Sequence, residues 1–212
     1  MDNLEKITLL NMIKLPIYYS GLPADLIKLS LPDNMMIAGK RFAIPQDIDS
    51  FTSSINYGQR LYLSHPEPND FALIIRMIAG YYYSFYTKKS WDEDNVSLFS
   101  KIVVTCKAIE IYPTAMHLLN LMGELADREK TLLHREPSQM ERAAGIERLN
   151  SFTELNNLDF LRDAMKCTVP EVLLTPYNEC LVRFINAKEV FDYQTRYFEI
   201  QKADNEAKNK NR

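Results

Sequence analysis

The most apolar stretch of the chain runs from residue 69 to residue 86, and its apolar side chains cover more than one face of a helix. Ala72, Leu73, Met77 and Ala79 add apolar surface beside the main face. That main face follows a spacing of three and four residues and comprises Phe71, Ile74, Ile75, Ile78, Tyr81, Tyr82 and Phe85. A helix that is apolar nearly all round is buried on several flanks, so the pattern predicts a central helix over about 70–86 with Asn69 as N-cap.

A helix is also predicted just before this central one, and it is expected to begin at Pro45 because proline suits the first helical position. Asp47 and Asp49 would complement the positive end of that helix. Its apolar stripe comprises Ile48, Phe51 and Ile55. The turn HPEPND at 65–70 then leads into the central helix.

Two longer helices are expected after the central one. Ser90 and Glu93 have the spacing of a capping box, which predicts a helix that ends at Tyr112 before Pro113. The inward residues of this helix are Val96, Phe99, Val103 and Cys106. Pro113 is then predicted to open a helix that stops near His134. The inward residues of that second helix are Met116, Leu119, Met122, Leu125 and Ala126.

Shorter helices and one long helix are predicted in the last third of the chain. Capping boxes at Ser138–Glu141 and Thr168–Glu171 each mark a helix start, the first helix ending near Phe152. Residues 158–165 predict a further short helix, and Pro176 is expected to open a last helix that runs to about residue 205. Alternating steps of four and three residues along it resemble a coiled-coil seam: Tyr177, Leu181, Phe184, Lys188, Phe191, Thr195 and Phe198.

The two ends of the chain differ from the helical middle. Residues 4–44 are punctuated by prolines, and the segments 26–31 and 35–44 indicate a small antiparallel strand pair, with an extended arm as the alternative. Residues 201–212 lack large apolar side chains and so predict a polar tail. We therefore expect a mainly α multi-helix bundle, divided into an N-terminal arm or hairpin (1–44), a helical domain (45–200) and a polar C-terminal tail (201–212).

The composition favours a folded protein that meets other proteins. The net charge of -3 provides no global attraction to nucleic acid or an anionic membrane, and no stretch is apolar for long enough to span a bilayer. The 12 Tyr and 10 Phe are residue types enriched at protein interfaces. Cys106, Cys167 and Cys180 have no close pairing, which predicts free thiols. Together these features predict a protein that is cytosolic or assembles in a cytosol.

No constellation in the sequence indicates catalysis, a cofactor or a metal centre. His117 and His134 flank one predicted helix without metal-ligand spacing, and the acidic residues after Trp91 are better explained by a helix N-terminus. Neither a nucleophile with a neighbouring base nor a phosphate-binding glycine loop is evident. The triplet 81–83 could stack nucleobases, but core and interface packing explains it better. The segment 145–149 offers a small-residue surface for either tight packing or a subunit contact.

Several stretches, taken together, resemble structural proteins of tailed bacteriophages, in particular of the crAss-like group. They lie between residues 79 and 149 and read AGYYY (79–83), WDED (91–94), REPS (135–138) and AAGIERL (143–149). The resemblance implies a helical ring or adaptor protein, in about a dozen copies between portal and tail, that often sends a terminal extension into a neighbour. It would belong to the tail or connector region of the virion and be assembled in the host cytoplasm.

The expected partners are copies of the chain itself in a ring and neighbouring portal or tail ring proteins. We expect no membrane contact, and nucleic acid at most as cargo passing through a channel. Both ends of the chain are expected to be ordered by such partners. The candidate interface residues are Tyr81, Tyr82, Tyr83, Trp91, Phe191, Tyr193, Tyr197, Phe198, Lys202, Lys208, Lys210 and Arg212. Alternatives are a tail-assembly chaperone, a cytosolic protein-binding adaptor and, less favoured, an enzyme of unknown reaction.

Overall fold

The computed structural model describes residues 29–67 and 69–210, and this part of the chain is largely helical, with one small antiparallel hairpin and a long C-terminal helix. The expected fold class is confirmed. The elements are β1 (Asn34–Ile37), β2 (Lys40–Ala43), α3 (Ile48–Ser54), α4 (Tyr57–Ser64), α5 (Asp70–Thr87), α6 (Glu93–Val103), α7 (Ala108–Leu133), α8 (Gln139–Ala143), η3 (Ile146–Phe152), α9 (Thr153–Met165), α10 (Val169–Leu174) and α11 (Tyr177–Lys210).

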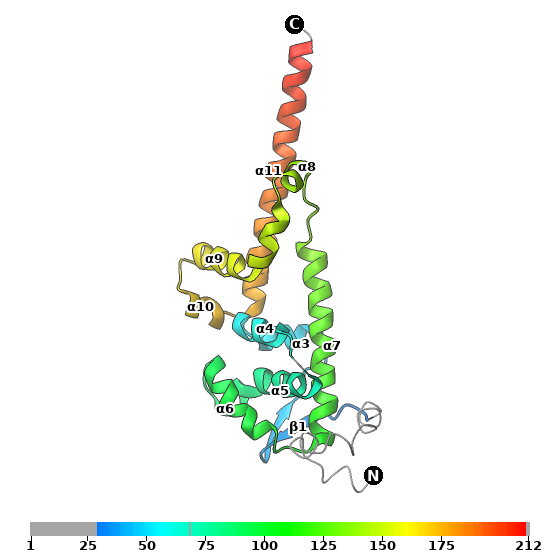
Figure 1. Ribbon diagram of the computed structural model, residues 1–212, viewed down its shortest axis with the longest axis vertical. Coiled ribbons are helices and arrows are strands. Elements are labelled where there is room, and N and C mark those ends of the chain that lie inside the picture. Colours follow the sequence, from blue (N-terminus) through cyan, green and yellow to red (C-terminus); the bar gives the residue numbers. More distant parts are fainter. Residues whose placement is uncertain (1–28, 68, 211–212) are drawn as a thin grey trace.

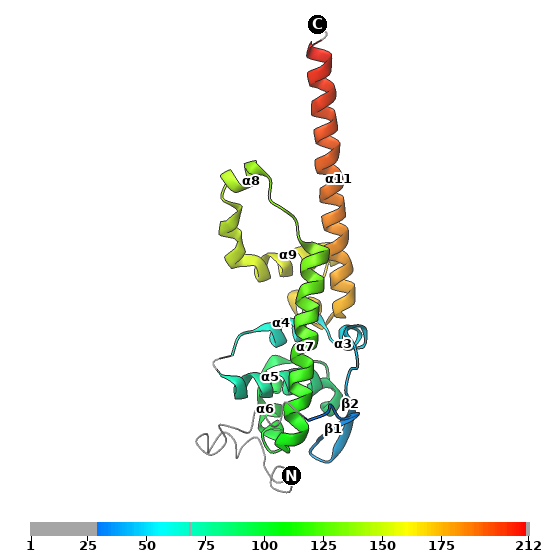
Figure 2. The same ribbon diagram turned by 90° about the vertical axis from the view of Figure 1, so that its right-hand side faces the viewer.

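The molecule is elongated, with a packed base and a long projecting helix (Figure 1). The base contains the hairpin, α3 to α6 and the first half of α7, and α11 leaves it at mid-height and extends far beyond it. We call α8, η3 and α9 (residues 139–165) the arm, because Figure 2 shows them as an excursion beside α11 that returns toward the base. The two ends of the described chain therefore lie at opposite ends of the molecule.

Helix α5 forms the centre of the base, as the apolar pattern predicts. It packs against α4, α6 and α7, and residues from Met77 to Tyr83 are buried without interruption. The side chain of Asn69 accepts a hydrogen bond from the backbone N–H of Ala72 at 2.9 Å, which confirms Asn69 as N-cap. Burial on more than one side follows from apolar residues at consecutive positions, because these cannot share a single helix face.

The hairpin lies within the second of the two predicted strand segments. Met35 pairs with Phe42, and the turn between the strands places Ala38 and Gly39 at positive φ, as a two-residue hairpin loop requires. Met35 and Ile37 are buried and bring β1 against α7. The first predicted segment is not a strand over residues 29–31, and residues 26–28 lie outside the described part of the chain.

The single helix predicted from Pro45 is two helices in the structure. Asp47, not Pro45, marks the start of α3, because its carboxylate accepts a hydrogen bond from Ser50 N at 2.7 Å. The chain is extended at Ile55, and Asn56 then caps α4 by accepting from Gln59 N at 2.8 Å. The reciprocal bond from Asn56 N to the side chain of Gln59 completes a capping box, which stops α3 from continuing into α4.

Two further predicted boundaries are wrong. Asp92, not Ser90, caps α6, and its carboxylate accepts from Asp94 N at 3.0 Å. Pro113 neither ends one helix nor opens the next, because α6 ends at Val103 and Pro113 lies inside α7. Since α7 begins only at Ala108, its first N–H groups lack helical partners in any case, and the proline removes one bond next to that turn. Burial of the surrounding α7 residues offsets that loss.

The arm and the last helix agree with the sequence at some of their boundaries and differ at others. The capping box at Ser138–Glu141 is present, but α8 ends at Ala143 and Gly145 takes a positive φ before the 3-10 turn η3. Helix α9 begins at Thr153, earlier than predicted, and Glu171 accepts from the backbone of Thr168 as expected. Helix α11 starts after Pro176 and continues to Lys210, so the polar segment from residue 201 is helical as far as it is described.

Candidate protein–protein interface

The base of α11 is fixed to the core by backbone hydrogen bonds. Tyr177 N donates to Ile55 O at 3.0 Å and Tyr57 N donates to Thr175 O at 2.9 Å, so the chain before α11 pairs with the break between α3 and α4. Tyr177 is buried, and its hydroxyl donates to Glu129 on α7 at 2.8 Å. The direction in which α11 leaves the core is therefore set by contacts on two sides of its first turn.

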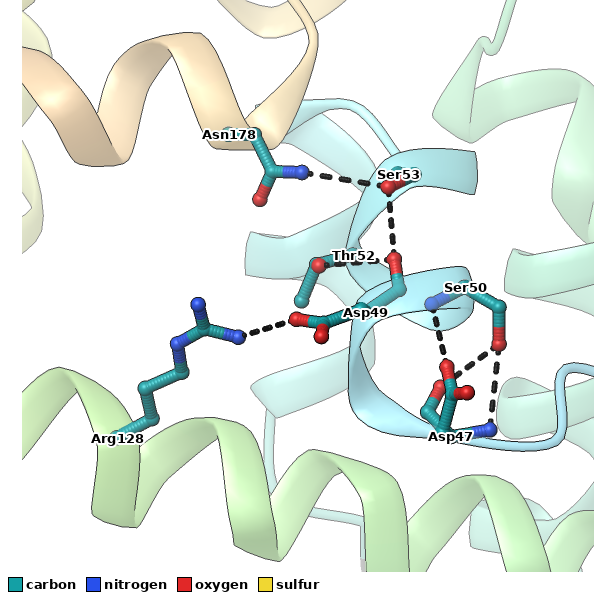
Figure 3. Close-up of polar contacts among 7 residues, drawn as sticks. All are labelled: Asp47, Asp49, Ser50, Thr52, Ser53, Arg128 and Asn178. Atoms are coloured by element: carbon teal, nitrogen blue, oxygen red, sulfur yellow. Dashed lines mark hydrogen bonds and ion pairs between the residues drawn. The ribbon is translucent and has the colours of Figure 1, made fainter.

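Polar contacts around α3 add to this anchoring (Figure 3). Arg128 on α7 forms an ion pair with Asp49 at 2.8 Å. The side chain of Asn178 on α11 approaches the hydroxyl of Ser53 at 3.5 Å, a long hydrogen bond. Helix α3 thus touches both α7 and α11. The Arg128–Asp49 pair is exposed, so we assign it a positioning role and little stability.

Beyond its base, α11 makes few contacts with the rest of the described chain. We call residues 190–210 the α11 tip, and every residue of this tip from Tyr193 to Asn209 is exposed. Large apolar side chains nevertheless continue along it, with 41–65% of each exposed: Val190, Phe191, Tyr193, Tyr197, Phe198 and Ile200. A helix face that is apolar, rimmed by charge and uncovered in the chain is typical of a surface that binds another protein.

The tip turns its apolar face away from the rest of the molecule. At about 100° per residue, Val190, Tyr193 and Tyr197 share one side of the helix, and Asp192 and Glu199 lie opposite. The loop before the arm covers that charged side, where Asp192 and Glu199 line a hollow of about 670 Å³. Arg135 from this loop places its guanidinium 4.2 Å above the Phe191 ring, at the margin of the apolar face. Within residues 29–67 and 69–210, the chain's own contacts therefore leave the apolar side of the tip exposed.

The candidate interface residues of the central helix are not on the surface. Tyr81, Tyr82 and Tyr83 are between 1% and 3% exposed and Trp91 is 8% exposed, so a partner cannot reach them in this structure. Their rings stack within the base, and the hydroxyl of Tyr82 donates to Ala43 O at 3.1 Å. Tyr81, Tyr82 and Tyr83 lie in the core because consecutive positions of a helix with neighbours on several sides are all covered.

Six of the other candidate residues are exposed. Phe191, Tyr193, Tyr197 and Phe198 form the aromatic part of the tip described above. Lys202 and Lys208 are exposed farther along the tip. Nothing is described for the side chain of Lys210 or for Arg212. Of the ten predicted positions whose side chains are described, four thus lie in the core and six on the tip, where the four aromatic residues form one surface.

A second uncovered apolar surface lies on the arm, which the sequence reasoning did not single out. Leu149, Phe152 and Leu155 are each more than half exposed. Leu149 and Phe152 lie in the 3-10 helix η3, whose three-residue repeat places them in line, and Leu155 follows in the first turn of α9. Phe152 and Leu155 line a groove between the arm and the core.

We call this groove the arm groove, and its volume is about 650 Å³. Its apolar lining is Tyr57, Leu61, Leu133, Phe152, Leu155 and Phe184. Asn150, Asn157 and Glu154 add polar groups to the lining. The groove therefore combines apolar depth with hydrogen-bonding groups, which suits side chains that carry both, such as tyrosine.

Arg60 and Glu129 line the arm groove, and together with the buried Tyr177 they form a hydrogen-bonded ionic cluster. Arg60 donates from Nε to Glu129 at 2.9 Å and from Nη2 to the second carboxylate oxygen, and Tyr177 donates to the same carboxylate. Burial lowers the pKa of Arg60, but the hydrogen bond and charge of Glu129 more than offset this, so the pKa is raised. Burial, with the charge of Glu129, raises the pKa of Tyr177. The cluster joins α4, α7 and α11 rather than presenting a reactive group.

The histidines and cysteines have local structural contacts. A ring nitrogen of His117 lies 2.7 Å from Pro45 O, and His134 pairs with Glu136. Cys106, Cys167 and Cys180 are free thiols, as predicted, and burial raises the pKa of Cys180 to about 12. Among residues 29–67 and 69–210 there is no group of three or more His, Cys, Asp or Glu that could hold a metal ion. No helix in the same ranges is both long and apolar enough to cross a membrane.

Comparisons of the chain with protein-family models, with curated proteins and with solved structures gave no match.

Proposed function

We propose that this chain is a structural assembly subunit that acts through protein–protein contacts, and specifically a ring or adaptor subunit linking portal and tail in a tailed bacteriophage. The observation that carries the assembly part is the α11 tip. Its apolar residues are between 41% and 65% exposed, on a helix whose base is firmly anchored. Four aromatic side chains in water are unfavourable for an isolated chain and favourable for one that buries them in a partner.

The phage part of the proposal rests on the resemblance of the four stretches between residues 79 and 149. In the structure these stretches lie in the core of α5, before α6, in the loop before the arm and within the arm. A ring is the arrangement in which a projecting helix on each copy contacts the next copy around a closed symmetry axis. Its partners in this proposal are copies of itself and the portal or tail ring proteins above and below.

A tail-assembly chaperone or a cytosolic adaptor would use the same tip on a different partner and would not form a ring of its own. Measuring mass separates these functions. Light scattering of the purified chain is expected to show a discrete species of many copies of the 24.6 kDa subunit, and electron microscopy is expected to show closed rings. A chain that stays monomeric at high concentration would contradict the ring proposal and favour the adaptor.

Deleting residues 199–212 tests the role of the end of the tip. The shortened protein is expected to keep its melting temperature, because the removed residues are exposed as far as they are described. Its assembly with the next component is expected to weaken. Normal assembly of the shortened protein would instead make this segment a solubilising end.

A further inference from the structure

We propose that the apolar face of the α11 tip binds in the arm groove of a second copy of this chain, so that copies join head to tail. This inference rests on the proposed assembly function and names the surface that receives the tip. The described part of the chain carries two uncovered apolar surfaces of different shape: the convex α11 tip and the concave arm groove.

The tip of one chain cannot reach its own groove. Both surfaces belong to elements fixed to the same core, since Tyr177 anchors α11 and Phe184 of α11 is part of the groove lining. From there α11 is a single continuous helix that extends away from the base, past the arm (Figure 2). A straight helix rises about 1.5 Å per residue, so Tyr197 lies about 20 Å along the axis from Phe184. The groove is therefore open to the tip of another copy.

The chemistry of the two surfaces matches. Tyr193 and Tyr197 each carry an apolar ring with a hydroxyl at its end. The groove has apolar depth, and Asn150 and Asn157 offer amide groups that can bond those hydroxyls. Tyrosine is favoured at interfaces because one side chain satisfies both requirements.

The charges of the two surfaces are complementary as well. The arm carries five acidic residues against three basic ones, and within the described ranges neither Glu147 nor Glu154 is in an ion pair. On the tip, Arg196 lies beside Tyr197 in the sequence, and within the described ranges it is in no ion pair. Attraction between Arg196 and the unpaired carboxylates of the arm favours this pairing.

The available area is of the right order. An aromatic side chain buries about 150–250 Å² in full, so four that are about half exposed offer on the order of 400 Å². Val190 and Ile200 on the same helix add to this area. The sum stays below the roughly 800 Å² per partner of a standard-size stable interface and corresponds to a smaller contact. Because the two surfaces differ, the contact is heterologous and repeats from copy to copy until it closes.

Complementation between two variants tests the proposal. Tyr197→Glu disables the tip and leaves the groove intact, and Leu155→Glu disables the groove and leaves the tip intact. Each variant alone is expected to raise the concentration needed for assembly about 30-fold or more, because a charge replaces a central apolar contact. Mixed in equal amounts, they are expected to form a dimer through the one intact tip and the one intact groove.

Leu98→Glu is the matched control, because Leu98 is 58% exposed and lies on α6, away from both surfaces. This variant is expected to assemble as the unchanged chain does. Melting temperatures verify that all three variants fold, which is expected because each position is about half exposed. Normal assembly of Leu155→Glu, or a mixture that stays monomeric, would overturn the head-to-tail contact. The assembly function would survive both results, whereas an unchanged chain that is monomeric would overturn the function and this inference together.

Discussion

Two pairs of tyrosines have opposite environments: Tyr81 and Tyr82 lie on the apolar helix α5, and Tyr193 and Tyr197 lie on the largely polar helix α11. The first pair is between 1% and 3% exposed, and the second pair is 62% and 47% exposed. Helix α5 has α4, α6 and α7 around it, whereas in the described part of the chain the α11 tip is approached on its charged side, by the loop before the arm and by α8. Aromatic content therefore marks a surface that will be buried, and the neighbours decide whether burial occurs within the chain or between chains.

An acidic substitution on each helix gives the largest expected contrast. Ile78→Asp is expected to reduce the free energy of unfolding by more than about 3 kcal/mol, because Ile78 is fully buried and the carboxylate would have no partner. Ile200→Asp on the tip is expected to change it by less than about 0.5 kcal/mol. Urea denaturation of the dissociated chains measures both values. An Ile78→Asp protein with an unchanged melting temperature would show that α5 is not the core.

The second largest contrast concerns the ionic cluster of Arg60, Glu129 and Tyr177, which links α4 and α7 to the base of α11. Glu129→Gln is expected to reduce the free energy of unfolding by about 2–3 kcal/mol, because it leaves the Arg60 guanidinium without its counter-charge. The side chains are 21% and 17% exposed, so solvent limits the loss. Asp49→Asn, which breaks the exposed pair with Arg128, is the control and is expected to cost less than about 1 kcal/mol. Equal losses in the two variants would show that the Arg60–Glu129 pair contributes no more stability than the exposed Arg128–Asp49 pair.

Glycine replacements compare how tightly helices are covered. In Gly80→Ala on α5 the new methyl group would lie 2.7 Å from the Tyr62 ring and 2.9 Å from Leu63, so we expect a loss of about 1–3 kcal/mol. In Gly123→Ala on α7 the methyl group meets nothing within 4 Å, and we expect a gain of up to about 1 kcal/mol from helix propensity. Thermal unfolding of both variants gives the two signs. A stable Gly80→Ala protein would mean that α4 lies farther from α5 than described.

The smallest expected effect is confined to alkaline pH. Burial raises the pKa of Tyr57 from 10.0 to about 12, so its hydroxyl stays protonated in the folded chain where the unfolded chain ionises. The stability associated with this group is complete below pH 10 and is lost as the pH rises toward 12. Tyr57→Phe is expected to make the alkaline decline in melting temperature shallower. An identical decline in the variant would assign it to other tyrosines.

The sequence predicts elements well where a local rule decides them. Asn69, the Ser138–Glu141 box and Pro176 mark helix starts through contacts within a few residues, and the apolar positions of α5 identify its buried faces. The break at Asn56 follows the same rule, since Asn56 and Gln59 have the spacing of a capping box, which is a signal visible in the sequence.

Long-range packing accounts for what the sequence does not predict. Pro113 stays inside α7 because the turns around it are buried against α5, a contact without local signature. The burial of the triplet 81–83 and the formation of the arm groove depend on which helices lie alongside. The aromatic residues of the tip are predictable without the fold, because there are more of them than one intramolecular helix face can bury.

The uninterrupted length of α11 gives the tip a rotational phase as well as a reach. Each residue added between the anchored first turn and Val190 would advance the tip by about 1.5 Å and turn its apolar face by about 100°. One inserted residue would thus point the aromatic side chains well away from their present direction, while seven would return them to within about 20° and move them outward by about 10 Å. The direction of the apolar face and its distance from the base are therefore linked. The helix can be lengthened without turning this face away only by insertions close to a whole number of turns.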